Sequence, residues 1–538
     1  MAALAKNQAR DTIQSGLLLR PNGVKIILNK KVCCALSLAC AYLFFHASPI
    51  SANTSVGCDP NAITRANDLI SAIQSSVTTG GSQSISLAPS CIYTLTQVNS
   101  GSGVDLNGLP VISNTVSLTI TGNGATISRD PAAPQFRFLS VLTNSQLTLI
   151  NLTLAGGHAV DGPFITVTAS YAGDGGAILN AGQLTLIDSA FQNNRAGDNG
   201  CTVAKGFDCS MADFHAGSGG AISNSGNLTM VNTLVEGNRA GYAELETPLP
   251  GGGGIANWGS ILVTGSTFLN NQAGDCLVCV GDLGGPGGGA IFNAGFAEIR
   301  STNFLSNTAR SSYMARTGGG AISFFGTGIG IGDKLYMAYN GSAFGSAINI
   351  GNSGSFTLTN STLFHNNYQF GDGAESTVFY AGNLALVHVT LVPDGASTYA
   401  IESRGSGNMS ITVNSSLITG LCDSYFSYAH PTSTYIGNYN VLNPSCVVTP
   451  TIPSSNLYTL NFGLDPAGPQ NNGGATPSIA LMPPSLAINF VPLSACAAQT
   501  SQNGVARPQG SGCDAGAYES PWRYFYLPNT LRVWASAW

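Results

Sequence analysis

Residues 175–197 read GGAILNAGQLTLIDSAFQNNRAG, and the same pattern returns three more times along the chain. Residues 219–241 read GGAISNSGNLTMVNTLVEGNRAG, residues 252–274 read GGGIANWGSILVTGSTFLNNQAG, and residues 288–310 read GGAIFNAGFAEIRSTNFLSNTAR. The four copies align without a gap. Such a repeat indicates one small structural unit stacked many times, because a single unit buries too little apolar surface to be stable alone.

Each repeat contains three short strands separated by turns. Asn180-Ala181-Gly182 and its counterparts form a tight turn after the first strand, since Asn and Gly tolerate a positive φ. The second strand alternates apolar and polar residues, and the third carries Phe191, Val235, Phe268 and Phe304 in register. Three strands per repeat predict one coil of a parallel β-helix, with coils about 4.8 Å apart.

An asparagine recurs near the end of each copy. Stacked coils would bring these side chains together as a hydrogen-bonded ladder at one corner. The sequence therefore predicts an all-β fold, a single-stranded right-handed parallel β-helix over residues 81–420. A leucine-rich horseshoe needs a helical segment in each repeat, and a propeller needs about four strands over roughly 40 residues; neither fits these copies. The ladder residues are Asn194, Asn238, Asn271 and Asn307.

Inserts separate the repeats, and each insert follows the asparagine-containing end. Weaker copies begin at residues 319 and 345. Residues 198–218, 242–251 and 275–287 are therefore expected to project from one edge of the β-helix. Loops on a rigid scaffold often carry function; the alternative is that these are tolerated surface insertions.

Composition agrees with β-structure and excludes some functions. Of 538 residues, 67 are Gly and only 9% are charged, against about 25% charged in ordinary soluble domains. Outside residues 1–52 the chain has 14 basic and 25 acidic residues, a net charge of −11. A surface of this sign repels nucleic acid and anionic lipid, so no nucleic-acid partner is expected.

The N-terminal segment has the pattern of an export signal. Lys25, Lys30 and Lys31 precede an apolar run over residues 32–45, and ASPISA at 47–52 resembles a signal-peptidase site. The run is shorter than the about 20 residues that span a bilayer, so a membrane anchor is the less favoured alternative. Residues 1–52 are thus predicted to be a signal peptide, and the remainder to be exported without a transmembrane span.

Ten cysteines lie outside this signal, and they form five couples that are close in sequence. An even number predicts disulfides made in an oxidising compartment. Cys276 and Cys279 also fit a redox or zinc motif, but no second CxxC lies nearby, so a structural bridge is favoured. The ten are Cys58, Cys91, Cys201, Cys209, Cys276, Cys279, Cys422, Cys446, Cys496 and Cys513.

Weaker signals mark the two ends of the solenoid. Residues 58–75, within a segment 53–80, read as an amphipathic helix that would cap the first coil. The repeat decays after about residue 375, and residues 421–519 are predicted to form a loop-rich C-terminal cap, followed by a tail at 520–538.

Short motifs carry a resemblance to a known family. The segments GLPVI (108–112), GNGATI (122–127) and CDAGAYE (513–519) resemble bacterial β-helix proteins with a choice-of-anchor Q C-terminal domain. The GGAI repeats resemble those of polymorphic outer membrane proteins. The resemblance spans residues 60–519 and implies a pectate-lyase-like β-helix, export, and display at the cell surface or outer membrane. It implies no activity, because most such proteins have no determined function.

The C-terminal motif departs from that family at one place. Residues 501–504 read SQNG where the family has Asp-Gln-Arg-Gly, so an ion pair made by that Asp and Arg is lost. Arg507, Asp514 and Glu519 are expected to form a structural ion-pair cluster rather than a catalytic one.

Two functions fit the sequence. The first is a non-catalytic adhesive or binding protein, and the alternative is a lyase or hydrolase that acts on extracellular polysaccharide. Such enzymes use a base and clustered or paired carboxylates. Asp188 has the counterparts Asn232, Gly265 and Ser301, so no ladder of carboxylates is expected along the coils.

Carboxylates in the inserts are the remaining candidates for a site. If the inserts converge, these side chains, with Lys205 and His215 nearby, would bind Ca²⁺ or a sugar; solvated loop charges are the alternative. No firm metal site and no other cofactor follow from the sequence. The expected ligand is an extracellular glycan or a host or cell-surface molecule. The candidates are Asp198, Asp208, Asp213, Asp275 and Asp282.

Overall fold

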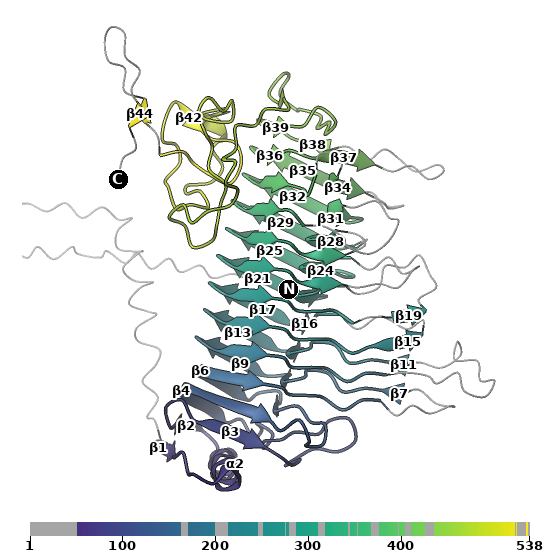
Figure 1. Cartoon of the computed structure of the whole chain (residues 1–538), viewed down its shortest axis with the longest axis vertical. Coiled ribbons are helices and arrows are strands. Elements are labelled where there is room, and N and C mark those ends of the chain that lie inside the picture. The colour runs from purple at the N-terminus through teal and green to yellow at the C-terminus, as the bar shows by residue number, and fades with distance from the viewer. Residues whose placement is uncertain are drawn as a thin grey trace, which may run out of the picture. The chain divides into compact units, whose positions relative to one another are not determined.

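The computed structural model shows a right-handed parallel β-helix, as predicted (Figure 1). Strands of successive coils pair in parallel and build three long faces, all within one compact unit, Ser51–Trp538. The structure describes residues 51–162, 170–199, 214–245, 251–274, 276–278, 287–309, 318–342, 345–351, 353–366, 376–395, 398–403, 410–424, 435–521, 523–524 and 534–535.

Each complete coil gives one strand to each face. The first face contains β5 (Leu139–Val141), β8 (Ile178–Asn180), β12 (Ile222–Asn224), β16 (Ile255–Asn257), β20 (Ile291–Asn293), β24 (Ile322–Phe324), β28 (Ile348–Ile350), β31 (Ser376–Tyr380), β34 (Tyr399–Ser403) and β37 (Leu421–Ser424). The second face contains β1 (Ser51–Val56), β2 (Ser82–Leu87), β4 (Ser117–Arg129), β6 (Gln146–Ala155), β9 (Gln183–Ile187), β13 (Asn227–Val231), β17 (Ser260–Thr264), β21 (Phe296–Arg300), β25 (Ile329–Asp333), β29 (Ser355–Thr359), β32 (Asn383–Val387), β35 (Ser410–Asn414) and β38 (Tyr435–Ile436).

The third face meets the second face at a corner. Strands β4 and β6 continue around this corner, because their C-terminal halves pair with strands of the third face. The third face contains β3 (Ile92–Leu95), β10 (Ala190–Gln192), β14 (Leu234–Glu236), β18 (Thr267–Leu269), β22 (Asn303–Leu305), β26 (Tyr336–Ala338), β30 (Thr362–Phe364), β33 (Thr390–Val392), β36 (Leu417–Ile418), β39 (Val441–Leu442) and β40 (Leu457–Tyr458).

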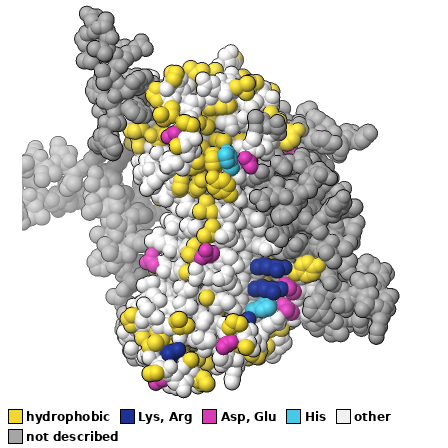
Figure 2. All heavy atoms as spheres, viewed as in Figure 1, with side chains coloured by type: hydrophobic (Ala, Val, Ile, Leu, Met, Phe, Trp, Pro, Cys, Tyr) yellow, Lys and Arg dark blue, Asp and Glu magenta, His cyan; other side chains and the backbone are white. Residues whose placement is uncertain are grey.

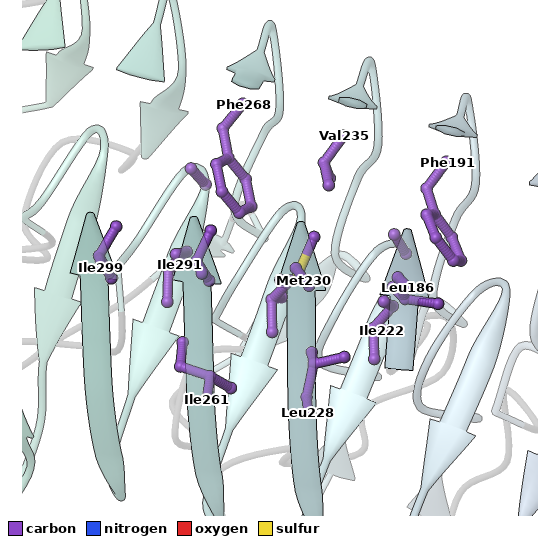
Figure 3. Packing of buried hydrophobic residues seen from close by; sticks show 14 of the residues in the cluster. Leu186, Phe191, Ile222, Leu228, Met230, Val235, Ile261, Phe268, Ile291 and Ile299 are labelled. Carbon is purple, nitrogen blue, oxygen red and sulfur yellow. The ribbon is translucent and has the colours of Figure 1, made fainter. Parts of the chain in front are cut away.

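The core is a set of rows in which equivalent residues of successive coils lie in register. Leu184 pairs with Leu228, and Leu228 with Ile261. Because side chains of a strand alternate between its two sides, a coil in register keeps the same row inside. Phe268 and Phe304 stack in this way with their ring centroids 5.0 Å apart. Figure 3 shows Phe191, Val235 and Phe268 following one another along the stack.

The backbone conformation at the corner between the second and third faces explains which residue types occupy that corner. Asp188, Asn232 and Ser301 have φ values of 48°, 49° and 48°, and Gly265 has 63°. This left-handed region is open to Gly and comparatively favourable for Asn and Asp. Asp188 is therefore a turn residue at a position that requires a left-handed backbone conformation. Its exchange for Asn, Gly or Ser in other coils does not mark a decayed catalytic row.

Asparagine side chains form a continuous ladder after the third face. Asn194 Nδ2 donates to Asn238 Oδ1, at 2.9 Å. Each Oδ1 also accepts the backbone N–H of the Asn one coil earlier, and each Nδ2 also donates to a strand carbonyl. All of these amides are buried, so they satisfy backbone groups that water cannot reach. The ladder links Asn194, Asn238, Asn271, Asn307, Asn340 and Asn366.

A second asparagine ladder lies at the turn after the first face. The sequence predicted only a tight turn there. Asn180 Oδ1 does accept the N–H of Gly182 (3.2 Å), and Asn180 Nδ2 also reaches Asn224 Oδ1 of the next coil (2.6 Å). The same link joins Asn224 to Asn257 and Asn257 to Asn293. Two corners of the coil are thus fixed by buried amides.

The N-terminal end is covered by a helix, α2 (Ala62–Thr79). It begins later than the expected 58–75 because Asn61 is its N-cap, whose Oδ1 accepts the Ile63 N–H at 2.9 Å. Leu69 and Ile73 are fully buried against the first coils. A disulfide between Cys58 and Cys91 ties the start of this segment to the stack.

Three of the expected cysteine couples are disulfides in the structure. Besides Cys58–Cys91, the bonds are Cys422–Cys446 and Cys496–Cys513. The side chains of Cys201, Cys209, Cys276 and Cys279 lie outside the described residues.

The C-terminal region differs from a simple end cap. Stacked strands continue past residue 421, as far as β40. Residues 461–521 then pack on the side of the stack. Thr362 Oγ1 donates to Gln502 Oε1 (2.6 Å), and Gln502 Nε2 donates to Leu335 O (3.0 Å). This segment, called here the lateral domain, therefore covers part of the third face, with β41 (Val491–Pro492), a 3₁₀ turn at Leu493–Ala495 and β42 (Gly512–Cys513).

The predicted C-terminal ion-pair residues lie together inside the lateral domain. Arg507 Nη1 donates to Glu519 Oε2 at 2.9 Å and to the Asp514 carbonyl at 2.8 Å. The Asp514 carboxylate accepts the N–H groups of Asn489 (2.7 Å) and Ser520 (2.6 Å). All three charged residues are buried. Their bonds join segments of the domain to one another, which is a structural role.

Two groups near this cluster have strongly displaced pKa values in opposite senses. Burial, together with the charge of Glu519, raises the pKa of Asp514 to about 7. Burial and the charge of Arg507 lower the pKa of His388, on the corner before β33, to about 3.

Within the described ranges no helix is both long and apolar enough to cross a membrane.

Replacing one ladder asparagine should destabilise the solenoid. Asn238→Ala leaves the Asn194 N–H and the Phe191 carbonyl without their partner, so the free energy of unfolding should fall by about 3 kcal/mol. Asn227→Ala, at an exposed position of the same coil, should change it by less than about 0.5 kcal/mol. Urea unfolding followed by circular dichroism measures both. Equal effects of the two substitutions would contradict the role given to the ladder.

The opposed pKa shifts predict how pH acts on the lateral domain. A carboxyl whose pKa is raised on folding stabilises the fold at low pH, and this stability is lost as pH rises through about 7. A histidine whose pKa is lowered stabilises the fold above its ordinary pKa of about 6.5, and this is lost as pH falls. The two effects cancel over much of the acidic range. His388→Asn should therefore make the domain more stable as pH falls from about 7 to about 4, and Asp514→Asn should make it less stable.

Hydrogen exchange of residues 461–521 as a function of pH reads out this local stability. Asn suits the left-handed φ of 52° at residue 388. Parallel pH profiles for the two variants would show that these groups do not titrate as described.

Candidate functional site

The bases of the inserts lie on one side of the β-helix. Each insert leaves the stack after the asparagine ladder and returns before the first face. Three short parallel pairs mark these bases: β7 (Ser170–Tyr171) with β11 (Phe214–His215), β15 (Ala243–Leu245) with β19 (Cys276–Val278), and β23 (Thr308–Ala309) with β27 (Gly341–Ser342). Figure 1 places the first two pairs at the same edge of the stack.

Glycines let the outgoing and returning chains approach closely at these bases. The Gly197 N–H donates to the Gly173 carbonyl, and the Gly217 N–H donates to the Gly197 carbonyl, both at 2.8 Å. A Cβ on Gly197 would lie 2.1 Å from the carbonyl oxygen of Val160, and one on Gly217 would lie 2.0 Å from that of Gly173. The Gly of the repeated N-R-A-G motif is therefore required by packing of backbone on backbone.

The residues that follow the ladder asparagines, with His158 at the equivalent place one coil earlier, form a column on the surface beside the inserts. His158 pairs with Arg195, and Arg195 pairs with Arg239, in parallel bridges between coils. Gln272 and Thr308 continue the column. Figure 2 shows Arg or Lys, His and acidic side chains gathered in one short column on a face that is otherwise mostly uncharged. We call His158, Arg195 and Arg239 the basic column.

Two carboxylates accompany the basic column, which corrects the expectation that no carboxylate ladder exists. Asp161 and Asp198 occupy equivalent places on successive coils, because the Asp198 N–H donates to Asp161 Oδ1 at 2.8 Å. The Tyr242 N–H donates in the same way to Asp198 Oδ1, also at 2.8 Å. The ladder was missed because the coil that contains Asp161 lacks the GGAI start of the later repeats, although its residues 146–162 align without a gap with residues 183–199.

The first carboxylate of this ladder is held by a histidine and an amide. His158 Nε2 lies 3.4 Å from Asp161 Oδ1, and Gln135 Nε2 donates to Asp161 Oδ2 at 2.6 Å. Burial alone would raise the pKa of Asp161, but the hydrogen bonds from His158 and Gln135 outweigh it and hold the pKa below its usual value. Asp161 is therefore a fixed, ionised carboxylate at neutral pH.

The second carboxylate fixes one arginine, and the other arginine has no acid beside it. Arg195 Nη2 forms an ion pair with Asp198 Oδ2. Burial and the charge of Arg239 lower the pKa of Arg195. Among the described residues the Arg239 guanidinium has no ion-pair or hydrogen-bond partner, and the buried Nε of each arginine is also without one.

An aromatic pair lies on the returning chains of the same edge. The rings of Tyr171 and His215 stack with centroids 5.0 Å apart and 7° between their planes, and Tyr171 is 54% exposed. The chain below them is fixed by Asp174, whose Oδ1 accepts the Ser218 N–H at 2.7 Å. Burial raises the pKa of Asp174. The edge thus presents an exposed aromatic platform as well as charged groups.

Only some of the predicted site residues belong to this edge in the described structure. Asp198 and His215 do, and Asp198 acts as a partner for Arg195. Asp208, Asp213, Asp275, Asp282 and Lys205 lie outside the described residues. Within those residues no cluster of three or more His, Cys, Asp or Glu side chains is placed to hold a metal ion. The arginines were missed, although N-R-A-G repeats at 194–197 and 238–241.

Comparison with known proteins found no match. No family model, no curated protein and no solved structure matches the chain. The geometry of the insert edge is therefore the evidence on which a function is proposed.

Proposed function

We propose that this protein is an exported, surface-displayed β-helix that binds an extracellular glycan along its insert edge, without catalysing a reaction. The export and display parts of this proposal draw on the signal-like residues 1–52 and on the resemblance to choice-of-anchor Q and polymorphic outer membrane proteins. The three disulfides fit an oxidising compartment.

The observation that carries the proposal is the concentration of binding groups on one rigid edge. Arg195, Arg239 and Asp198 offer charged hydrogen-bonding groups, and Tyr171 offers an exposed ring. Sugars are bound through such a mixture, in which polar groups fix the hydroxyls and an aromatic ring packs on the apolar side of the pyranose. The coils behind the edge are fixed by buried amide ladders, so the groups are held in place before a ligand arrives.

A polysaccharide lyase is the second candidate, and one observation favours it. An arginine can serve as the base in such enzymes when its pKa is lowered, and burial and Arg239 lower the pKa of Arg195. Its ion pair with Asp198, however, holds the charged form of the guanidinium in place. Binding is therefore favoured over proton abstraction at this edge.

A panel of neutral and acidic glycans would test the proposal with purified full-length protein. We expect saturable binding to a subset of glycans, with no new unsaturated or reducing ends. Tyr171→Ser should weaken that binding by roughly threefold to tenfold, because it removes the exposed ring. Leu262→Ser, at an exposed second-face position, is the matched control and should bind as the unmodified protein does.

Three outcomes would contradict the proposal. Unsaturated ends that form with time would show that the protein is the lyase instead. Absence of binding across the panel, or equal binding losses in both variants, would rule out glycan recognition at the insert edge.

A further inference from the structure

We propose that Arg195 and Arg239 form a site for the acidic group of a glycan, a carboxylate or a sulfate. This inference rests on the proposed function for the identity of the larger ligand, but the anion site itself does not. It assigns a ligand class to two arginines whose Nε–H groups have no acceptor among the described residues.

The first support is the unbalanced charge of the arginine pair. The backbones of Arg195 and Arg239 are bridged on adjacent coils, so their side chains start about 4.8 Å apart. Like charges so placed repel each other unless an anion lies near both. Asp198 neutralises Arg195, and no described side chain neutralises Arg239. One further negative charge beside Arg239 would complete the pairing.

The second support is the hydrogen-bonding capacity left unused. The Nε atoms of Arg195 and Arg239 are buried from water, yet neither has a partner among the described residues. Buried donors without acceptors are unfavourable and uncommon in folded proteins. Because the Nε atoms are covered, an anion would meet the Nη–H groups of Arg239, which are not among the buried atoms. Two Nη–H bonds of one guanidinium lie side by side and match the two oxygens of a carboxylate or two of a sulfate.

The third support is the direction of the column. Polar side chains follow the arginines coil by coil, with His158 before them and Gln272 and Thr308 after them. The spacing of about 4.8 Å between coils is close to the length of one sugar unit in an extended chain. An acidic glycan lying parallel to the β-helix axis would therefore meet the arginines with its acid group and the neutral residues with its hydroxyls.

The carboxylate ladder limits which anions fit. Asp161 and Asp198 lie three residues beyond His158 and Arg195, and both are bound as fixed acceptors. Acidic groups of a ligand that lie over these two carboxylates would be repelled, whereas acidic groups that lie over the arginines would be attracted. The arrangement therefore favours a glycan whose acidic groups follow the arginines over nucleic acid.

Isothermal calorimetry with the full-length protein tests the site with three probes. These are inorganic sulfate, an oligogalacturonate, and the matched neutral galactose oligomer. Arg239→Gln should weaken binding of oligogalacturonate or sulfate by about tenfold or more, because a charge-assisted interaction is lost. Binding of the neutral oligomer should be unchanged. Arg300→Gln removes an equal charge from the second face, where Arg300 pairs with Glu298, and should have no such effect.

The outcomes separate this inference from the proposed function. Glycan binding that is insensitive to Arg239→Gln would overturn the anion site and leave the proposed function standing. Sulfate binding that depends on Arg239, with no glycan bound, would support the anion site and contradict the proposed function. If the unmodified protein binds none of the three probes, the anion site is wrong. A preference between sulfate and carboxylate identifies the acidic group.

Discussion

The register between successive coils determines both which side chains enter the core and which form rows on the surface. Parallel strands pair so that each residue lies over its equivalent in the next coil, and two buried asparagine ladders hold that alignment at the corners. A slip of one residue in a strand would turn its apolar row outward. It would also separate the ladder amides from their partners. Stability and register are thus set by the same interactions.

Register also explains how a short repeat can build a binding surface. Each outward-facing position of the repeat becomes a row on the outside of the stack. A motif such as N-R-A-G therefore places arginines on adjacent coils without a dedicated loop. The inserts begin beside this column and return through the aromatic pair Tyr171 and His215. The rigid coils fix the charged groups, and the inserts are free to differ in length and sequence.

The sequence was sufficient to predict the β-helix, its asparagine ladder and the common edge of the inserts, because these follow from local periodicity. It was not sufficient for contacts made between distant segments. The packing of the lateral domain on the third face depends on Gln502 reaching Thr362 and Leu335, and no pattern in either segment indicates this. The pairing of Asp161 with Asp198 crosses 37 residues. Residues 146–162 align without a gap with residues 183–199, but this coil lacks the GGAI start that marks the later copies. Asp188 and its counterparts vary in residue type because all of them occupy a corner with a left-handed backbone conformation. Their variation therefore says nothing about catalysis.

The most direct test of glycan recognition by the arginine column is a crystal structure with a bound oligogalacturonate. We expect a sugar carboxylate within hydrogen-bond distance of the Arg195 and Arg239 guanidinium groups, with the glycan chain running along the β-helix axis. A ligand bound instead at the turn between the first and second faces, near exposed residues such as Trp258 and Phe325, would contradict glycan recognition by the arginines.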